Sequence, residues 1–388
     1  MTNPDQLRQA FNALYGNEPR FFRAPGRVNL IGEHTDYNDG LVLPMAIDLS
    51  TVTAGAARDD RTVRVYSLNV TEQFEFNLDL PGMRRRGIWP DYAEGVARML
   101  EADGVRLRGA DLLVSSDVPV GAGLSSSAAL EISVGFALLS LSGAEVDRTA
   151  LALAGQKAEH EYVGARVGIM DQLTATTARR HHAMLIDCRT LATTYLPLDT
   201  SGVAVVVCDS GVKHDLAASE YNTRRAECEL GVELLRQFIP GIRALRDVSV
   251  DDFSKYETHL PDPVRRRCRH VITENQRTLD AAAALRSGNL EELGRLMVGS
   301  HLSLRHDYEV SCFELDTLVS AALLTDGVIG ARMTGGGFGG STVNLVRRDA
   351  IEGFRNAISR EYQSAKGVSP AIYVVEAGQG AEEIVASE

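Results

Sequence analysis

The chain contains 388 residues, of which 44% are hydrophobic and 24% charged, a composition that is typical of globular proteins and excludes wholesale disorder. Lys and Arg number 40 against 52 Asp and Glu, which gives a formal net charge of −12. An acidic surface repels nucleic-acid backbones, so we expect no nucleic-acid partner. An anionic substrate would need a local cationic pocket or a metal ion.

The five cysteines are widely spaced and include no CxxC pair. This spacing fits neither a zinc site nor a disulfide framework, and the odd number fits a reducing cytosol. No apolar run approaches the roughly 18 residues that a membrane helix needs, and the first residues are polar with mixed charge. We therefore expect a cytoplasmic protein without a membrane span or a signal peptide.

Hydrophobic periodicity predicts a mixture of strands and helices. In the first half we expect strands over 51–57, 62–68, 71–78 and 110–115, and helices over 89–103, 130–141 and 148–163. In the second half we expect strands over 203–208, 327–333 and 341–346, and helices over 215–238 and 263–287. Strand signals restart near residues 190–205, so we expect two domains, 1–195 and 196–388. The predicted fold class is α+β.

Charged and turn-forming residues alternate most densely between Arg23 and Gly40. The charged or titratable side chains of this segment include Arg27, Glu33, His34, Asp36 and Asp39. Such groups can converge on a polar ligand such as a sugar, whose hydroxyls need both donors and acceptors. A solvated surface loop would have the same composition, so both interpretations remain open.

Small residues gather in the segment Asp117–Ala129, which leads into the helix expected over 130–141. Gly121 and Gly123 allow backbone amides to approach an anion, and a helix N-terminus adds about half a positive charge. The serines at 125–127 can cap the helix or present hydroxyls to a metal ion. The Walker pattern GxxxxGK[ST] is absent. The segment is therefore either another kind of anion cradle or an ordinary serine-capped helix.

Two further segments combine glycine with polar residues. Asp171, in Gly168–Gln172, can be a base, a metal ligand or a helix N-cap, and capping is the commoner use of a lone aspartate. The segment Thr334–Ser341 formally contains GxGxxG, but a strand pattern follows it where a dinucleotide-binding fold needs a helix. We predict instead a buried glycine turn that packs against a ligand-binding loop.

Taken together, these motifs resemble those of the GHMP small-molecule kinases, and within that family those of the galactokinases. The resemblance runs in family order from Phe22 to Val346. The matching segments are Gly26–Pro44 for the sugar signature, Val118–Ala129 for the ATP phosphate loop, Gly168–Gln172 for the stretch with the catalytic aspartate, Gly211–Asn222 for a stretch whose tyrosine meets the sugar, and Arg332–Gly340 for the third glycine motif. Ser341 stands where family members usually carry cysteine, and we expect little effect from a residue of similar size.

The resemblance implies a role for each matched residue. Asp171 would be the catalytic base, and Arg27 would stabilise charge near the reacting anomeric hydroxyl. The implied sugar-binding residues are Glu33, His34, Thr35, Asp36, Gly168 and Tyr221. The implied ATP-binding residues are Ser67, Gly121, Ala122, Gly123, Leu124, Ser125, Ser126 and Ser127. Ser127 and Glu159 would hold Mg²⁺.

The resemblance also implies a fold and an activity. Residues 1–195 would form a sugar- and ATP-binding domain like the second domain of ribosomal protein S5, and residues 196–388 a ferredoxin-like GHMP kinase domain, with the site between them. The implied reaction transfers the γ-phosphate of ATP, with Mg²⁺, to the anomeric hydroxyl of galactose. The alternatives are a family kinase for arabinose, galacturonic acid or N-acetylgalactosamine, or a non-catalytic galactose sensor. The intact run Ser125–Ala129 and Asp171 favour an enzyme over a sensor.

Overall fold

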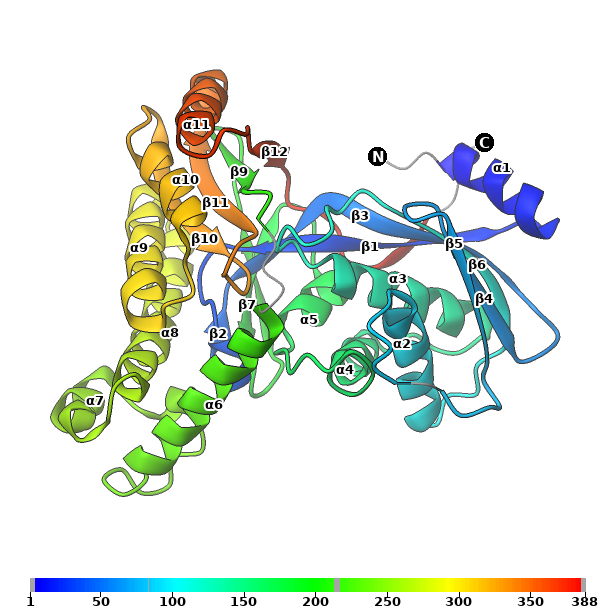
Figure 1. Ribbon diagram of the computed structural model, residues 1–388, viewed down its shortest axis with the longest axis horizontal. Coiled ribbons are helices and arrows are strands. Elements are labelled where there is room, and N and C mark those ends of the chain that lie inside the picture. The colour runs from blue at the N-terminus through cyan, green and yellow to red at the C-terminus, as the bar shows by residue number, and fades with distance from the viewer. Residues whose placement is uncertain (1–3, 83, 213–216, 385–388) are drawn as a thin grey trace.

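The computed structural model describes residues 4–82, 84–212 and 217–384. In Figure 1 the N-terminal sheet and its helices lie on the right, and α6 to α11 surround a second sheet on the left. The helices are α1 (Pro4–Tyr15), α2 (Pro90–Ala102), α3 (Ser126–Leu141), α4 (Arg148–Ala158), α5 (Met170–Thr177), α6 (Ala217–Leu235), α7 (Val250–Tyr256), α8 (Val264–Arg286), α9 (Leu290–Ser303), α10 (Phe313–Leu323) and α11 (Ile351–Lys366). A π-helical turn, Glu159–Val163, continues α4.

The larger sheet has the strand order β13-β1-β3-β6-β4-β5. Its strands are β1 (Arg20–Asn29), β3 (Pro44–Ala57), β4 (Thr62–Ser67), β5 (Glu72–Asn77), β6 (Ala110–Ser116) and β13 (Glu382–Ile384). Neighbours pair antiparallel except β4 and β6, which are parallel. Side chains alternate across β1, so Phe22 packs in the core under α3 while Phe21 packs on the opposite face with Phe11 of α1.

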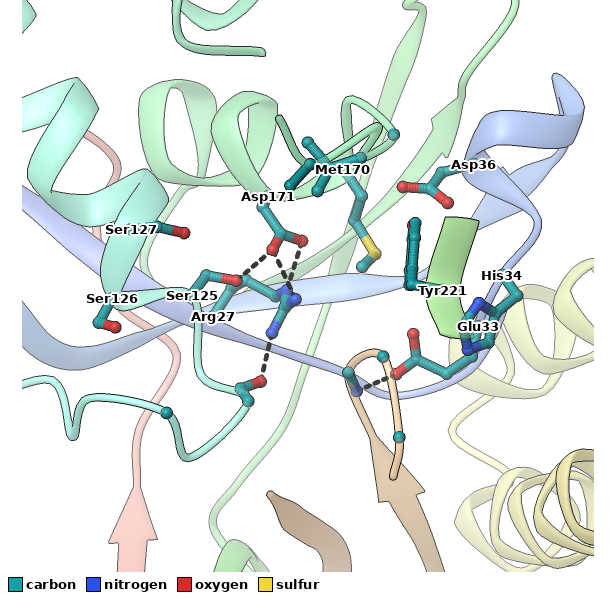
Figure 2. Close-up of a pocket in the computed structure, with 18 of the residues that line it drawn as sticks. Arg27, Glu33, His34, Asp36, Ser125, Ser126, Ser127, Met170, Asp171 and Tyr221 are labelled. Carbon is teal, nitrogen blue, oxygen red and sulfur yellow. Dashed lines mark hydrogen bonds and ion pairs between the residues drawn. The ribbon is translucent and has the colours of Figure 1, made fainter. Parts of the chain in front are cut away.

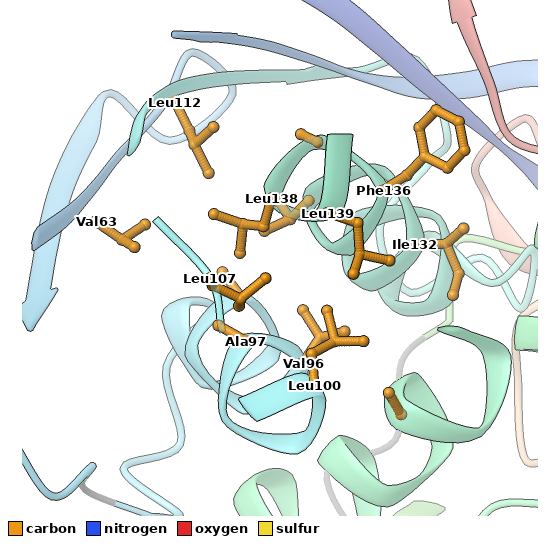
Figure 3. Close-up of a cluster of buried hydrophobic side chains, with 14 of the residues drawn as sticks. Val63, Val96, Ala97, Leu100, Leu107, Leu112, Ile132, Phe136, Leu138 and Leu139 are labelled. Atoms are coloured by element: carbon orange, nitrogen blue, oxygen red, sulfur yellow. The ribbon is translucent and has the colours of Figure 1, made fainter. Parts of the chain in front are cut away.

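The main core of this half lies between the sheet and the helices α2 and α3. Figure 3 shows Val63 and Leu112 of the sheet facing Leu138 of α3, with Leu100 of α2 below. Helix α3 contacts β1, β3, α2, α4 and α5. Because it is enclosed by these elements, α3 is apolar on nearly all sides. The core therefore fixes the N-terminus of α3 close to β1, where Arg27 N–H donates to the Leu124 carbonyl at 3.1 Å.

The second sheet has the order β10-β11-β9-β12 and is antiparallel throughout. Its strands are β9 (Val203–Asp209), β10 (Val328–Thr334), β11 (Ser341–Arg347) and β12 (Ala371–Val375). One face of β9 packs against α8 and α9, and the other against α10 and α11. Helices separate β9 from β10 and β11 from β12, so this is the βαββαβ connectivity of a ferredoxin-like domain. The ferredoxin-like prediction for the C-terminal part is confirmed.

A third, small sheet joins β2 (Leu41–Val42), β7 (His182–Asp187) and β8 (Thr193–Pro197) in the order β2-β7-β8. Near its C-terminus the chain returns to the N-terminal sheet. Ala377 bridges to Ile47 of β3, and β13 pairs with β1. The last described residues thus complete the N-terminal sheet. The division into domains at 1–195 and 196–388 stays a prediction.

The predicted α+β class is confirmed, and most expected elements form within a few residues of their predicted ends. The strand β1 was not expected, and β3 begins seven residues before the predicted strand at 51–57. The helix expected over 215–238 is α6, and the first two residues of the expected range lie outside the described residues. None of the helices in the described part of the chain is both long and apolar enough to cross a bilayer. All five cysteines are unpaired.

Candidate active site

A cavity of about 450 Å³ opens where the two large sheets meet. Its lining includes the end of β1 and the loop after it (Arg27, Glu33, His34, Asp36), the start of α3 (Ser125–Ser127), the start of α5 (Gly168, Met170, Asp171), α6 (Tyr221, Asn222) and the turn after β10 (Gly335–Phe338). Figure 2 shows the serines at one end, the acidic loop and Tyr221 at the other, and Asp171 with Arg27 between them. The sequence motifs therefore converge on one cavity.

Asp171 and Arg27 form a bidentate ion pair at the centre of the cavity. Arg27 Nε and Nη2 each lie 2.7 Å from an oxygen of Asp171, and Nη1 donates to the carbonyl of Gly123 at 2.7 Å. Arg27 is buried. Burial opposes its charge, but Asp171 and Glu33 outweigh burial and raise the pKa of Arg27. Asp171 lies in the first turn of α5 and caps no helix there. The pair therefore presents an oriented carboxylate and a fixed positive charge.

The segment Gly121–Ser127 lines the end of the cavity that lies away from Glu33 and Asp36. Ser125 occupies the N-cap position of α3 with φ of 60°, but its side chain makes no capping hydrogen bond. Its hydroxyl donates to Asp171 at 2.5 Å instead, so the alternative of an ordinary serine-capped helix does not hold at Ser125. Ser126 and Ser127 line the cavity in the first turn of α3, where backbone amides and the helix dipole favour an anion.

The acidic loop, which we define as residues 30–41, carries the buried carboxylate of Glu33 and the partly buried carboxylate of Asp36. Glu33 accepts hydrogen bonds from Gly335 N–H at 2.7 Å and Thr334 Oγ1 at 3.2 Å. Burial, and then the negative charges of Asp171 and Glu33, raise the pKa of Asp36 to about 7. The surface-loop interpretation of this segment is therefore wrong, because Glu33 is only 2% exposed.

Gly168 makes the position of Asp36 possible. A Cβ atom at Gly168 would lie 1.8 Å from Asp36 Oδ2, far inside any allowed contact. The glycine is thus a spacer for the carboxylate of the facing loop. The sequence placed Gly168 at the site only through the family resemblance.

His34 and Tyr221 add aromatic surface to this end of the cavity. His34 is buried with φ of 62°, and its ring lies 5.4 Å from that of Tyr221 and 4.7 Å from that of Tyr308. Burial lowers the pKa of His34 well below its usual value, so the ring is neutral near pH 7. Its Nδ1 lies 2.8 Å from the hydroxyl of Tyr37. A neutral imidazole can complement the two acidic side chains as a donor or acceptor.

Ser127 and Glu159 lie together at the edge of the serine end. Ser127 Oγ donates to Glu159 at 3.1 Å, and Gln172 Nε2 donates to the same carboxylate oxygen at 3.0 Å. Burial and the neighbouring Asp171 raise the pKa of Glu159 to about 7. Among the described residues, no group of three or more His, Cys, Asp or Glu is arranged to hold a metal. Any metal here would therefore depend on ligand oxygens as well.

The glycine turn after β10 packs directly on the phosphate-loop segment. A Cβ at Gly335 would lie 3.0 Å from the carbonyl of Gly123, and one at Gly340 would lie 3.3 Å from that of Ala122. The turn packs against this loop as predicted, with Gly335 buried but Gly336 exposed. Ligand binding by the loop stays a prediction. Ser341 Oγ donates to the Ala122 carbonyl at 2.7 Å, a bond that a thiol would make more weakly.

Five of the expected residues do not line the cavity. Glu159 is one of them, and it reaches the site only through its contact with Ser127. Thr35 is fully buried, and its hydroxyl donates to the Leu41 carbonyl at 2.7 Å, inside the acidic loop. Ala122 and Leu124 belong to the core beneath the phosphate-loop segment. Ser67 ends β4 outside the cavity lining that the structure describes.

The cavity also has lining residues that the sequence did not indicate. Tyr92, Val120, Met170, Asn222 and Phe338 line it. Val120, Met170, Asn222 and Phe338 lie inside segments that match the family motifs, but none of them was named as a site residue. Tyr92 lies outside those segments. Burial, and then the negative charge of Glu159, raise the pKa of Tyr92, which lies near the start of α2.

Fold and site together define a GHMP kinase. Residues 91–179 match the N-terminal domain of GHMP kinases, residues 281–364 match their C-terminal domain, and residues 9–57 match the galactokinase galactose-binding signature. The chain belongs to the galactokinase family. It is 51% identical over 380 residues to a galactokinase of Chloroflexus aggregans and 49% identical over 381 residues to one of Roseiflexus sp., covering 98% of this chain and 97% of each relative.

Solved structures agree with this assignment. The structure of Lactococcus lactis galactokinase complexed with galactose superposes with a TM-score of 0.94 at 36% identity, covering 98% of this chain and 99% of that one. Methanococcus jannaschii mevalonate kinase superposes with a TM-score of 0.64 at 17% identity, over 94% of this chain and 99% of that one. The second similarity, at this low identity, concerns the fold alone.

Proposed function

We propose that the protein is a galactokinase that transfers the γ-phosphate of ATP to the anomeric hydroxyl of D-galactose, as in galactose metabolism. The observation that carries this proposal is the position of the Arg27–Asp171 pair between the acidic loop and the start of α3. Phosphoryl transfer needs the acceptor hydroxyl in line with the γ-phosphate, and a side chain that orients this hydroxyl. The membership of the galactokinase family supports galactose as the acceptor.

In the proposed complex the sugar occupies the acidic-loop end. Glu33 and Asp36 accept hydrogen bonds from sugar hydroxyls, and His34, Gly168 and Tyr221 complete the pocket. Asp171 faces the anomeric hydroxyl and accepts its proton, or stabilises its partial charge. Arg27 holds Asp171 in place and offsets negative charge as the oxygen approaches phosphorus.

The phosphates of ATP occupy the serine end, against Gly121, Gly123 and the first turn of α3. The cavity needs more positive charge, because Arg27 is the only Lys or Arg among its described lining residues. Ser127 and Glu159 are hard oxygen donors that suit Mg²⁺ shared with phosphates. Burial raises the pKa of Glu159 to about 7, so this carboxyl must lose its proton to bind the ion, and a nearby cation would favour that loss. Mg²⁺, when bound, would supply charge neutralisation on the phosphates.

A reducing, cytoplasmic location belongs to the same proposal. The five unpaired cysteines support it, because such a set persists in a reducing compartment.

A coupled assay of ADP release tests the function directly. The purified protein with Mg²⁺ and ATP should release ADP with galactose, and much less with glucose, arabinose, galacturonic acid or N-acetylgalactosamine. When one sugar hydroxyl points the other way, a carboxylate of the pocket loses its hydrogen-bond donor. Sites built to bind a hydroxyl in this way discriminate between such sugars by about 10⁴-fold. Galactose binding without ADP release would identify a sensor, and comparable rates with galactose and glucose would contradict the proposed pocket.

A further inference from the structure

Helix α8 holds the backbone of the acidic loop with one face. Its side chains reach across from the C-terminal half to three backbone groups of the loop. His270 Nε2 donates to the Glu33 carbonyl at 3.1 Å, Glu274 Oε1 accepts from Gly32 N–H at 3.0 Å, and Asn275 Oδ1 accepts from Leu41 N–H at 2.9 Å. The loop that carries the proposed sugar ligands is therefore fixed from behind as well as through its own turns.

The packing between α8 and the loop leaves no room for adjustment. Gly32 has φ of 97°, and a Cβ there would lie 3.0 Å from Thr278 Oγ1 on α8. A Cβ at Gly40 would lie 2.5 Å from Asn275 Oδ1. Because both glycines let the helix touch the loop backbone, a change on α8 is passed to the loop instead of being absorbed between them.

Charged side chains alternate in sign from the sugar end of the cavity to α8. Glu33 lies 3.5 Å from Arg332 Nη2, and Glu274 Oε2 accepts from Arg277 Nε at 2.7 Å. Arg332 and Glu274 are both fully buried. Burial would raise the pKa of Glu274, but Arg277, His270 and Arg332 hold it at about 2. Glu274 is therefore an ionised carboxylate behind the loop.

Arg332 is placed between the two carboxylates without being fully bonded to either. Its Nη1 donates to the Asn29 carbonyl at 2.9 Å, while Nε and Nη2 form no hydrogen bond with any described residue. Burial lowers the pKa of Arg332, and the charges of Glu33 and Glu274 oppose that effect and favour its charged form. A guanidinium with buried free donors will turn toward whichever carboxylate remains if the other is neutralised.

We propose that Glu274 is a positioning residue for sugar recognition. It fixes the Gly32 backbone and balances Arg332, so that Glu33 keeps its place in the cavity. The inference rests on the proposed function, because it assigns the Glu33 end of the cavity to galactose. Loss of the Glu274 charge leaves Arg332 to pair more closely with Glu33, which draws that carboxylate away from the sugar.

The test is the kinetics of Glu274→Gln, which keeps the shape and an oxygen acceptor for Gly32 N–H but removes the charge. We expect the KM for galactose to rise about tenfold, with kcat and the KM for ATP within about twofold of the wild type. Asp280→Asn is the matched control, because it removes a charge from an exposed position on the same helix. It should leave all three parameters unchanged.

An unchanged galactose KM in Glu274→Gln would overturn the proposal. So would a parallel loss in galactose KM, ATP KM and kcat, because that pattern indicates general loosening. If Glu274→Gln does not fold, Ser300→Ala is the milder variant, since it removes the hydroxyl that donates to Glu274 at 2.5 Å. It should raise the galactose KM about twofold to fivefold, and no change would equally reject the role. Absence of galactose phosphorylation by the wild type contradicts the proposed function instead.

Discussion

Single atoms decide the shape of the sugar end of the cavity. Asp36 can occupy its position only because residue 168 has no Cβ atom. Asp171 is held on both oxygens by Arg27 and also accepts from Ser125. These contacts fix two carboxylates with different tasks, one that we assign to binding and one to the reacting hydroxyl.

Gly168→Ala should raise the KM for galactose by about 10- to 100-fold, because the new Cβ must push Asp36 from its position. The KM for ATP should change little. Gly353→Ala is the control, since a Cβ there meets nothing within 4 Å. Steady-state kinetics with each substrate varied in turn measure the effect. An unaltered galactose KM would show that Asp36 does not contact the sugar.

Asp171→Ala should lower kcat by about 10²- to 10⁴-fold, the usual contribution of a general base, while galactose binding stays within a modest factor. Asp171→Asn is the companion variant, because it keeps the shape beside Arg27 while removing the proton acceptor. Turnover by coupled assay and galactose binding by calorimetry separate the two effects. Near-normal turnover in folded protein would remove Asp171 from the mechanism.

Asp36→Asn should stabilise the free protein at pH 8 more than at pH 5. The folded pKa of Asp36 is about 7, against a usual value of 3.8. Between pH 3.8 and pH 7 the folded state therefore keeps a proton on Asp36 that the unfolded state has released. The stability that the protonated Asp36 contributes is lost as pH rises through 7. Asparagine avoids the loss, so we expect a gain of about 1–3 kcal/mol at pH 8. Urea denaturation at both pH values provides the measurement, and an equal change at both would contradict the shifted pKa.

At the scale of elements, the sequence predicted five of the eleven helices that the structure describes, and it missed the first strand of the N-terminal sheet. The pattern around Pro25 and Gly26 indicates a turn, yet β1 runs through both. The strand accommodates them by a register shift between Pro25 and Arg27. Gly26 is required because a Cβ would lie 2.7 Å from the Leu124 carbonyl. The local composition therefore did not indicate this strand, because Gly26 is needed for a contact with Leu124, about a hundred residues further along the chain.

The candidate site was predictable where motifs are local and unpredictable where distant elements support them. Arg27, Glu33, Asp36, Ser127 and Asp171 were expected at the site, and the structure brings all of them together. The contacts of α8 with the acidic loop were not expected. Their residues follow a helical pattern, and only the fold shows which face meets the loop.

The π-helical turn at the end of α4 brings Glu159 to Ser127, and turns of this kind are frequent at functional sites. Glu159→Gln should raise the Mg²⁺ concentration needed for half-maximal activity by about tenfold, because one ionic ligand is lost. Glu161→Gln is the control, since Glu161 lies on the same turn with its side chain 44% exposed. Titration of Mg²⁺ at saturating ATP and galactose distinguishes them. An unchanged requirement in Glu159→Gln would place the metal elsewhere.

Across the whole molecule, the C-terminal segment returns to support the element that carries Asp171. Gly380 N–H donates to the Ala178 carbonyl at 2.9 Å, and Ala381 N–H donates to that of Ala175 at 2.8 Å. Residues 175 and 178 lie at the end of α5 and just after it. The segment just before β13 is therefore part of the framework of the site.

A chain that ends at Glu376 should be less stable than one that ends at Ile384, by about 3 kcal/mol or more, because several backbone hydrogen bonds are lost together. Its kcat should also fall, because the end of α5 loses its support. Glu383→Gln is the control: it weakens a partly exposed ion pair with Arg20, which contributes little by itself. Denaturation and turnover are measured on all three. Equal stability of the two shortened chains would rule out this support.

The glycine turn after β10 touches both ends of the cavity through its backbone. Gly335 donates to Glu33 on the sugar side and packs on the Gly123 carbonyl on the phosphate side. A ligand that binds against the turn on one side therefore contacts a residue that also shapes the binding site for the other ligand. By thermodynamic linkage, any gain in galactose affinity from bound nucleotide must equal the gain in nucleotide affinity from bound galactose. The backbone contacts of Gly335 thus give the two substrates one shared element through which such a coupling would act.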